Sequence, residues 1–246
     1  MARAKTAKKM QPKKPAGSTD RRIGPLRWLR RWAVRLVLVA VAMMLLAVSW
    51  YSAFNPSRTL YMRQEARRLG GIDQVWVPLE NIAPTMARSV VAAEDANFCL
   101  HWGFDVEAIR AALEEGSGRG ASTISQQVVK NVYLWHGRNW ARKALEAVIT
   151  PTLEAVWSKR RIIEVYLNVA EFDEGVFGVE AAAQHYFGVN PADLSPIQAA
   201  RLAAVLPNPK ERSASRPDRA TARRAVAIMD GAETIRRDGR SACFED

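Results

Sequence analysis

The chain has 246 residues, of which 48% are hydrophobic, enough to form a folded domain with a core of its own. Its formal net charge is +11, but residues 1–35 hold 12 Lys/Arg and one acid, so this tail alone accounts for the excess. Because the rest of the chain is balanced, the sequence argues against a nucleic-acid-binding domain, whose surface would carry the basic residues.

An apolar segment follows the basic tail. No charged residue occurs between Arg35 and Arg58, and an α-helix of about 20 apolar residues crosses a bilayer core. We therefore predict a basic cytoplasmic tail at 1–35 and a transmembrane helix at 36–55, with the aromatic cluster Trp50, Tyr51 and Phe54 at the far interface. The alternative is a cleaved signal peptide ending near "AVS" at 47–49, but the tail is long for one.

The segment after the span is predicted to lie outside the cytoplasm, because the positive-inside rule places the basic flank in the cytoplasm. The chain has two cysteines, Cys99 and Cys243, which are 144 positions apart and do not make a disulfide framework. We predict that both are free thiols.

The remaining sequence is dominated by helical periodicity and predicts a mainly α fold, with one short candidate strand at 74–79. A helix is expected from Pro84, because Met86, Val90 and Ala93 recur on one face. Glu94 and Asp95 end this helix. Adjacent helical residues diverge by about 100°, so we expect the two carboxylates to do different work.

A glycine-rich stretch at 114–122 is predicted to be a loop that leads into a further helix. That helix has a buried row formed by Ile124, Val128 and Val132. Its opposite row is polar and is expected to face a groove or solvent; it consists of Thr123, Gln127, Lys130 and Asn131.

The next helical segment, 138–149, carries Arg142, Lys143 and Glu146 on one side and apolar residues on the other. Pro151 removes a helical hydrogen bond and is expected to kink or restart this helix. Further helices are predicted after Ser158 and Ser195, both suited to be N-caps. A final helix is expected near 217–230, so the domain is predicted to cover 56–230 and to be followed by a frayed tail at 231–246.

Several kinds of chemistry lack their residues in this sequence. Three histidines and two cysteines without paired spacing make a structural metal site improbable. Neither a GxSxG motif nor a serine followed three residues later by lysine is present, which argues against acyl transfer through a serine. Carboxylate acid/base chemistry is left, with Glu94 as a partly desolvated acid or base.

A cationic group accompanies this carboxylate. Lys130, Arg142 and Lys143, with Arg119 on the glycine-rich loop, are suited to hold an anionic leaving group such as a pyrophosphate. Glu146 is either a second acid in the same groove or only the i+4 partner of Arg142.

Four segments occur together in a specific order: "EDANFCLHWGFD", "GASTISQQVVKN", "RKALE" and "KRRIIEVYLN". In this order they resemble the motifs of the biosynthetic peptidoglycan glycosyltransferases, the lipid II polymerases, of the monofunctional membrane-anchored kind. The resemblance covers roughly residues 75–210. It implies a mainly α, lysozyme-like glycosyltransferase domain behind a single N-terminal transmembrane helix.

The resemblance also implies roles for individual residues. Glu94 would be the general base that accepts a proton from the acceptor 4-hydroxyl, and Glu146 would assist departure of undecaprenyl pyrophosphate. Residues of the same motifs would bind substrate or shape the cleft: Asp95, Phe98, His101, Thr123, Gln127, Lys130, Asn131, Arg142 and Lys143. The fourth motif, with Glu164, Tyr166 and Asn168, is expected to be mostly structural.

The implied substrate is lipid II with the growing glycan strand, and the implied location is the cell inner membrane with the catalytic domain in the periplasm. Neither a resident metal nor a required cofactor is expected, although the resemblance allows a divalent cation, Mg²⁺ or Mn²⁺, at the leaving group. Cell-wall synthases or division proteins are candidate partners. Two alternatives are a lytic transglycosylase or lysozyme-like hydrolase, which needs no pyrophosphate-binding cations, and a non-catalytic membrane-anchored scaffold.

Overall fold

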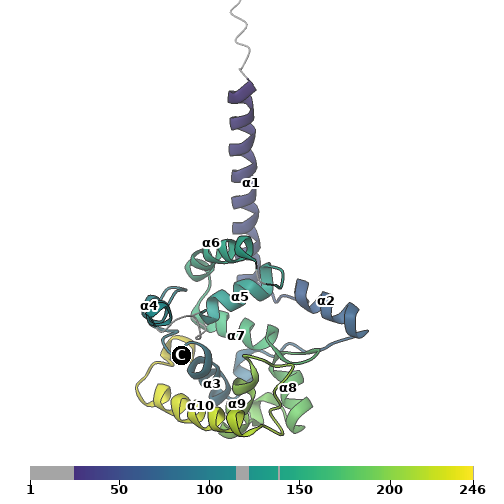
Figure 1. The fold of residues 1–246 in the computed structure, drawn as a ribbon, viewed down its shortest axis with the longest axis vertical. Helices are drawn as coiled ribbons and strands as arrows, with labels where there is room; N and C mark the ends of the chain where they lie inside the picture. Colours follow the sequence, from purple (N-terminus) through teal and green to yellow (C-terminus); the bar gives the residue numbers. More distant parts are fainter. Residues whose placement is uncertain (1–24, 115–121, 138, 246) are drawn as a thin grey trace, which may run out of the picture. The chain divides into compact units, whose positions relative to one another are not determined.

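A computed structural model describes residues 25–114, 122–137 and 139–245. Most of the predicted glycine-rich loop, Arg119 included, lies outside these residues. Contacts divide the chain into two units, residues 1–43 and 44–246. Helices dominate the described part (Figure 1) and have these bounds: α1 Pro25–Ala53, α2 Leu60–Leu69, α3 Pro84–Glu94, α4 Val106–Glu114, α5 Ile124–Tyr133, α6 Trp140–Val156, α7 Lys159–Val169, α8 Gly178–Phe187, α9 Pro196–Val205, α10 Arg219–Arg237 and α11 Ala242–Glu245.

Helix α1 covers all but the last two residues of the predicted span and begins earlier, at Pro25 rather than near residue 36. The arginines of this first part are good helix formers, so the helix extends into the basic flank. Residues Leu26–Ala53 are long and apolar enough to cross a membrane, the one such segment in the described ranges. This agrees with a membrane anchor.

The last residues of α1 belong to the second unit and are fixed by α7 and by the C-cap residue of α6. The Trp157 indole donates a hydrogen bond of 2.8 Å to the Val48 carbonyl. Arg161 donates to the carbonyls of Tyr51, at 3.1 Å, and Phe54, at 2.9 Å. The Tyr51 and Phe54 carbonyls have no intrahelical partner at this C-terminus, where a cation is also favoured by the helix dipole.

A small sheet of three short strands has the order β1-β3-β2, with bounds Asp73–Gln74, Val176–Phe177 and Glu171–Asp173 for β1, β3 and β2. Strand β1 pairs parallel to β3, and β2 pairs antiparallel to it. The expected strand at 74–79 is thus wrong beyond Gln74. The Val77 backbone bonds instead to the buried side chain of Asn168, which replaces a neighbouring strand.

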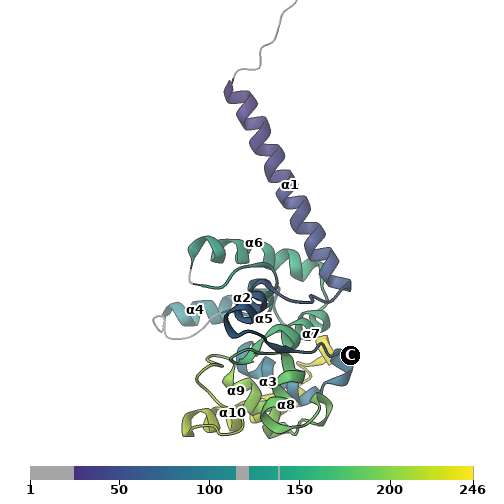
Figure 2. The same ribbon diagram turned by 90° about the vertical axis from the view of Figure 1, so that its right-hand side faces the viewer.

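Two groups of helices form the core of the second unit. Helices α3, α9 and α10 pack against one another, and α5 packs against α6 and α7 (Figure 2). The predicted row of α5 is confirmed, because Ile124, Val128 and Val132 are buried. Helix α3 therefore reaches the centre of the domain with its C-terminal residue, Glu94, between the two groups.

The predicted helix starts are confirmed by their caps. The Ser158 side chain accepts a hydrogen bond from the backbone of Arg161, and Ser195 with Gln198 forms the capping box that opens α9. Helix α6 continues through Pro151, so the expected restart is wrong. The lost hydrogen bond and the ring of an interior proline destabilise a helix, and burial of the residues on both sides of Pro151 offsets that cost.

The expected frayed C-terminus is wrong. Helix α10 continues to Arg237, and the following short helix α11 buries Phe244 completely. The expectation of free thiols is also wrong, because Cys99 and Cys243 form a disulfide. Their distance along the sequence is no guide to their distance in space, since α10 packs on α3 and brings the C-terminal residues back to the loop that follows α3.

Asn168 provides a test of the packing. Its side chain forms three hydrogen bonds, to the N–H and carbonyl of Val77 and to the Glu164 carbonyl. We expect Asn168→Ala to lower the free energy of unfolding by roughly 2–5 kcal/mol, because it leaves buried backbone groups unpaired. The exposed Asn190→Ala should cost less than about 1 kcal/mol. Thermal and urea unfolding in detergent would measure both, and equal stabilities would contradict this role.

Candidate active site

Glu94 is the last residue of α3, and its side chain is 14% exposed. The Gln127 amide donates a hydrogen bond of 2.9 Å to one carboxylate oxygen, and the Arg224 guanidinium lies 3.8 Å from the other. Burial raises the pKa of this carboxyl above its ordinary value, while Gln127 and the charge of Arg224 act in the opposite direction. A carboxylate with a raised pKa is better matched to proton transfer near neutral pH.

Asp95 points elsewhere, as the sequence predicted. One of its carboxylate oxygens lies 2.8 Å from His101 Nε2, and the other accepts a hydrogen bond from the Ile124 backbone N–H at 3.0 Å. The latter group is in the first turn of α5, where N–H groups lack intrahelical partners and negative charge is favoured. Asp95 therefore joins the end of α3 to the start of α5.

The other predicted residues of the first motif lie behind the site and not on its surface. Phe98 is completely buried, and the side chains of Asp95 and His101 are 1% and 9% exposed. Lys159 lies over the Phe98 ring and donates to the His101 carbonyl. The geometry gives these residues a supporting role, because an apolar ring and a buried pair of polar side chains need partners within the fold.

The polar row of α5 divides in the same way. Thr123 is a buried N-cap whose hydroxyl donates to the Gly103 carbonyl at 2.7 Å. Gln127, Lys130 and Asn131 line a cavity of about 310 Å³. The predicted groove face is thus formed by three of the four residues.

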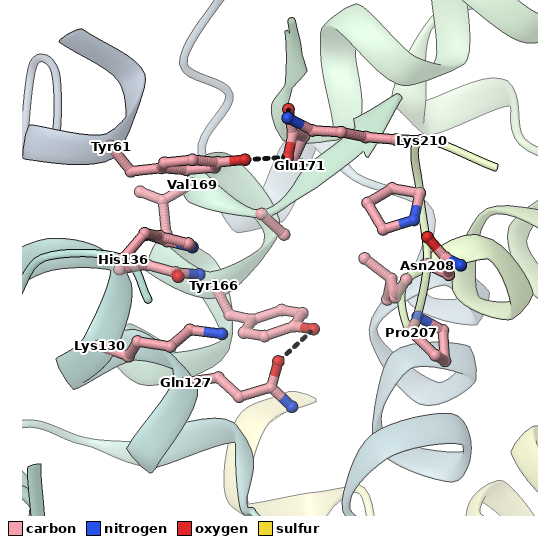
Figure 3. A pocket seen from close by; sticks show the side chains of 14 residues that line it. Tyr61, Gln127, Lys130, His136, Tyr166, Val169, Glu171, Pro207, Asn208 and Lys210 are labelled. Carbon is pink, nitrogen blue, oxygen red and sulfur yellow. Dashed lines mark hydrogen bonds and ion pairs between the residues drawn. The ribbon is translucent and has the colours of Figure 1, made fainter. Parts of the chain in front are cut away.

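Two lysines line this cavity, Lys130 and Lys210 (Figure 3), and Lys210 is already paired with Glu65 and Glu171. Burial lowers the pKa of the Lys130 ammonium group, while the carboxylates of Glu146 and Glu94 raise it. Within the described residues no carboxylate forms an ion pair with Lys130. A half-buried ammonium group without such a partner favours an incoming anion.

The third motif forms a compact ionic cluster on α6. The Glu146 carboxylate is 3% exposed and pairs with Arg142 at 2.9 Å and with Lys143. Arg142 also donates to the Gly137 carbonyl, and Lys143 to the Ser122 hydroxyl. The cations therefore exceed the acid by one charge, and Glu146 fixes the directions in which they point.

The far wall of the cavity was not predicted from the sequence. Figure 3 shows Asn208 and Lys210 facing Lys130 and His136 across the cavity, with Glu171 at one end. Tyr61 donates to Glu171 at 2.7 Å and stacks on His136, with ring centroids 3.5 Å apart. Burial is the main reason that the pKa of His136 falls to about 4, so its imidazole is neutral at neutral pH.

The transglycosylase family model matches residues 63–232, which include every site residue described above except Tyr61. The chain belongs to the biosynthetic peptidoglycan transglycosylases. A relative of that name from Jannaschia sp. (strain CCS1) is 60% identical over 88% of this chain and 90% of its own length. Those from Rhodospirillum centenum and Caulobacter vibrioides are 46% and 45% identical over 89% and 88% of this chain, and 97% and 96% of theirs. This transglycosylase is an enzyme, a peptidoglycan glycosyltransferase with the mainly α, lysozyme-like fold.

The donor set of this transglycosylase does not fit a divalent cation held by side chains. In the ranges that the structure covers, no three His, Cys, Asp or Glu residues form a group that could hold one. Both oxygens of Glu146 already face cations. Mg²⁺ and Mn²⁺ need several oxygen ligands, and the described side chains alone do not supply them.

This transglycosylase also exposes apolar residues on α6 and near α4. On α6 the predicted apolar side is split, since Ile149 is buried while Leu145 and Val148 are exposed. Trp140 and Trp102 are 91% and 70% exposed. Exposed apolar residues in such number are typical of a surface that contacts a membrane or another protein.

Proposed function

We propose that this transglycosylase polymerises lipid II into linear glycan strands with release of undecaprenyl pyrophosphate. The observation that supports this most is that a partly buried carboxylate and a partly buried cation are connected through one side chain. Glu94 and Lys130 are placed on either side of Gln127, which bonds to Glu94 and lines the cavity with Lys130. Glu94 is suited to accept a proton, and Lys130 is suited to stabilise negative charge on the substrate.

In the proposed step the acceptor's 4-hydroxyl oxygen attacks C1 of the donor sugar. Its proton passes to Glu94, a new C–O bond forms at C1, and the bond from C1 to the pyrophosphate oxygen breaks with inversion. Burial of Glu94 supports this role, since the raised pKa makes its carboxylate a stronger base. Gln127 and Arg224 hold the carboxylate in place for this transfer.

The leaving pyrophosphate needs positive charge where negative charge develops. Lys130 is the proposed contact, because its half-buried ammonium group lines the cavity and has no carboxylate ion-pair partner in the described ranges. Arg142 and Lys143 would extend the cationic surface. Glu146 is proposed to orient these two side chains and not to move a proton, since its two oxygens face them.

We propose that the enzyme lies in the inner membrane, with a cytoplasmic N-terminus and a periplasmic catalytic domain. The positive flank of α1 supports this orientation, as does the disulfide, because disulfides persist in oxidising compartments. The exposed apolar residues near α4 and α6 are proposed to contact the bilayer, where a lipid-linked substrate would enter. Cell-wall synthases or division proteins are proposed partners on resemblance alone.

Incubation of the purified protein with labelled lipid II in detergent tests the proposed reaction. Resolution of the products should reveal glycan polymer together with undecaprenyl pyrophosphate. Cleavage of preformed glycan strands would instead identify a lytic enzyme, and absence of any reaction across detergents and added cations would favour a scaffold. Either of these outcomes would overturn the proposal.

The topology has its own test. A reporter enzyme that is active only in the periplasm, fused after residue 60, is expected to be active, because the positive residues before α1 retain the N-terminus in the cytoplasm. A cytoplasm-dependent reporter at the same position should be inactive and serves as the matched control. The reverse pattern would refute the orientation without bearing on the reaction.

A further inference from the structure

The C-terminal residues 239–245 lie against the loop that connects α3 to α4. Cys243 forms its disulfide with Cys99 of that loop. The next residue, Phe244, is completely buried, with its ring centroid 6.3 Å from that of Phe98. A covalent bond and an apolar contact thus join the two segments side by side.

Polar contacts fix the same segment from several directions. Arg240 donates to the Ala96 carbonyl at 3.1 Å, and Arg160 of α7 donates to the Phe244 carbonyl at 3.2 Å. Arg88 of α3 pairs with Glu245 at 2.6 Å. Since Arg88 belongs to the helix that ends in Glu94, the C-terminal segment contacts both this helix and the loop that follows it.

The loop connects these contacts to the site. Phe98 packs edge-on against His101, with centroids 6.5 Å apart, and His101 pairs with Asp95. Asp95 in turn bonds to the first turn of α5, the helix that presents Gln127 to Glu94. A shift of Phe98 would therefore pass through His101 and Asp95 to the groups that hold the base.

We propose that the Cys99–Cys243 disulfide and Phe244 are positioning elements of the active site, which hold the loop behind Glu94 in its productive arrangement. None of them touches substrate. A misplacement of about 1 Å can cost a factor of about 100 in rate, so loss of this support lowers turnover. Substrate binding depends on Lys130 and the other cavity residues. Because the C-terminal segment does not contact them, binding is retained when the support is lost.

A simple cross-link would behave differently. A disulfide that closes a long loop stabilises a protein mainly through its effect on the unfolded chain. Breaking such a cross-link would lower the unfolding temperature, but it would leave the turnover of the folded enzyme unchanged. Turnover measured well below the unfolding temperature separates positioning from stabilisation.

The test uses the full chain in detergent with labelled lipid II. Dithiothreitol reduces the disulfide by thiolate attack on one sulfur, and its second thiol then closes a ring, so that two electrons pass to the protein and two cysteine thiols are released. Oxidised enzyme, reduced enzyme and Cys99→Ala/Cys243→Ala are compared by kcat, KM and circular dichroism. Reduction is expected to lower kcat about tenfold or more, with KM changed less than twofold and activity restored on reoxidation.

Two controls make the result specific. The double alanine variant should have the low kcat of the reduced enzyme and should not respond to dithiothreitol. Phe244→Leu, which keeps an apolar side chain, should retain more turnover than Phe244→Ala. If the double variant does not fold, reduced enzyme with an unchanged helical spectrum carries the comparison.

An unchanged kcat after reduction of folded enzyme, or a rise in KM alone, would overturn the positioning role. The proposal rests on Glu94 as the base of the proposed reaction. Oxidised enzyme that forms no polymer would refute that reaction. Active enzyme whose kcat does not change when the disulfide is reduced would refute only the inference drawn from the C-terminal segment. The two failures are therefore distinguishable.

Discussion

Glu94→Gln is expected to lower the rate of glycan polymerisation by roughly 10²–10⁴-fold, the usual contribution of a general base. The amide keeps the size of the side chain and can still face Gln127 and Arg224, but it cannot accept the proton. The fold should be unchanged, because no residue of the core depends on this carboxylate. Initial rates with labelled lipid II, together with circular dichroism, would measure both effects.

Glu180→Gln is the matched control for this substitution. Glu180 lies in α8, where its carboxylate accepts a hydrogen bond from Gln184 at the surface, so its loss should leave the rate within about twofold. A Glu94→Gln enzyme with more than a tenth of the normal rate would show that the proton leaves by another path.

Lys130→Met is expected to reduce kcat/KM by roughly 10²–10³-fold, the effect of removing one group that stabilises developing negative charge. Methionine is close in length and apolar, so the substitution removes the charge with little change in packing. Arg219→Met, which removes a positive charge at the exposed start of α10, should leave kcat/KM nearly unchanged. Loss of equal size in both variants would indicate a general effect of net charge.

The pH dependence of wild type follows from the same two groups. Glu94 must be ionised to act as a base, and burial raises its pKa, so activity should fall on acidification at a pH above the ordinary range of glutamate. Lys130 must be protonated, and burial lowers its pKa, so activity should fall on the alkaline side at a pH below the ordinary range of lysine. We therefore expect a bell-shaped dependence of activity on pH. The bell should be narrower than the ordinary pKa values of glutamate and lysine would give.

Lys130→Arg distinguishes the alkaline group. A guanidinium stays protonated throughout this range, so the alkaline decline of kcat/KM should move to higher pH while the acid decline stays in place. An unchanged alkaline decline in Lys130→Arg would assign that decline to a group other than Lys130.

Much of this site could be predicted from local sequence patterns. The caps at Ser158 and Ser195 and the buried row of α5 depend on neighbouring residues only, and these predictions are confirmed. The divergence of Glu94 and Asp95 follows from helical geometry and is also found. The order of the motifs identified the family.

Contacts between distant segments could not be predicted in this way. Arg224 reaches Glu94 because α10 packs against α3, and no spacing within the sequence encodes that approach. Lys210 reaches Tyr61 and Glu171 for the same kind of reason. Phe98 was expected to shape the cleft because its motif resembles that of the family, but its position relative to the core decides its burial.

The hydrogen bonds at the end of α1 determine where a shortened form of the enzyme can begin. A shortened chain that begins at residue 56 removes the carbonyls that Trp157 and Arg161 contact, and it leaves a buried indole N–H without its acceptor. A chain that begins at Met44 keeps these carbonyls and the compact unit intact. The edge of the folding unit therefore lies inside the hydrophobic segment. Removal of the entire segment would lower the free energy of unfolding as well as raise the solubility.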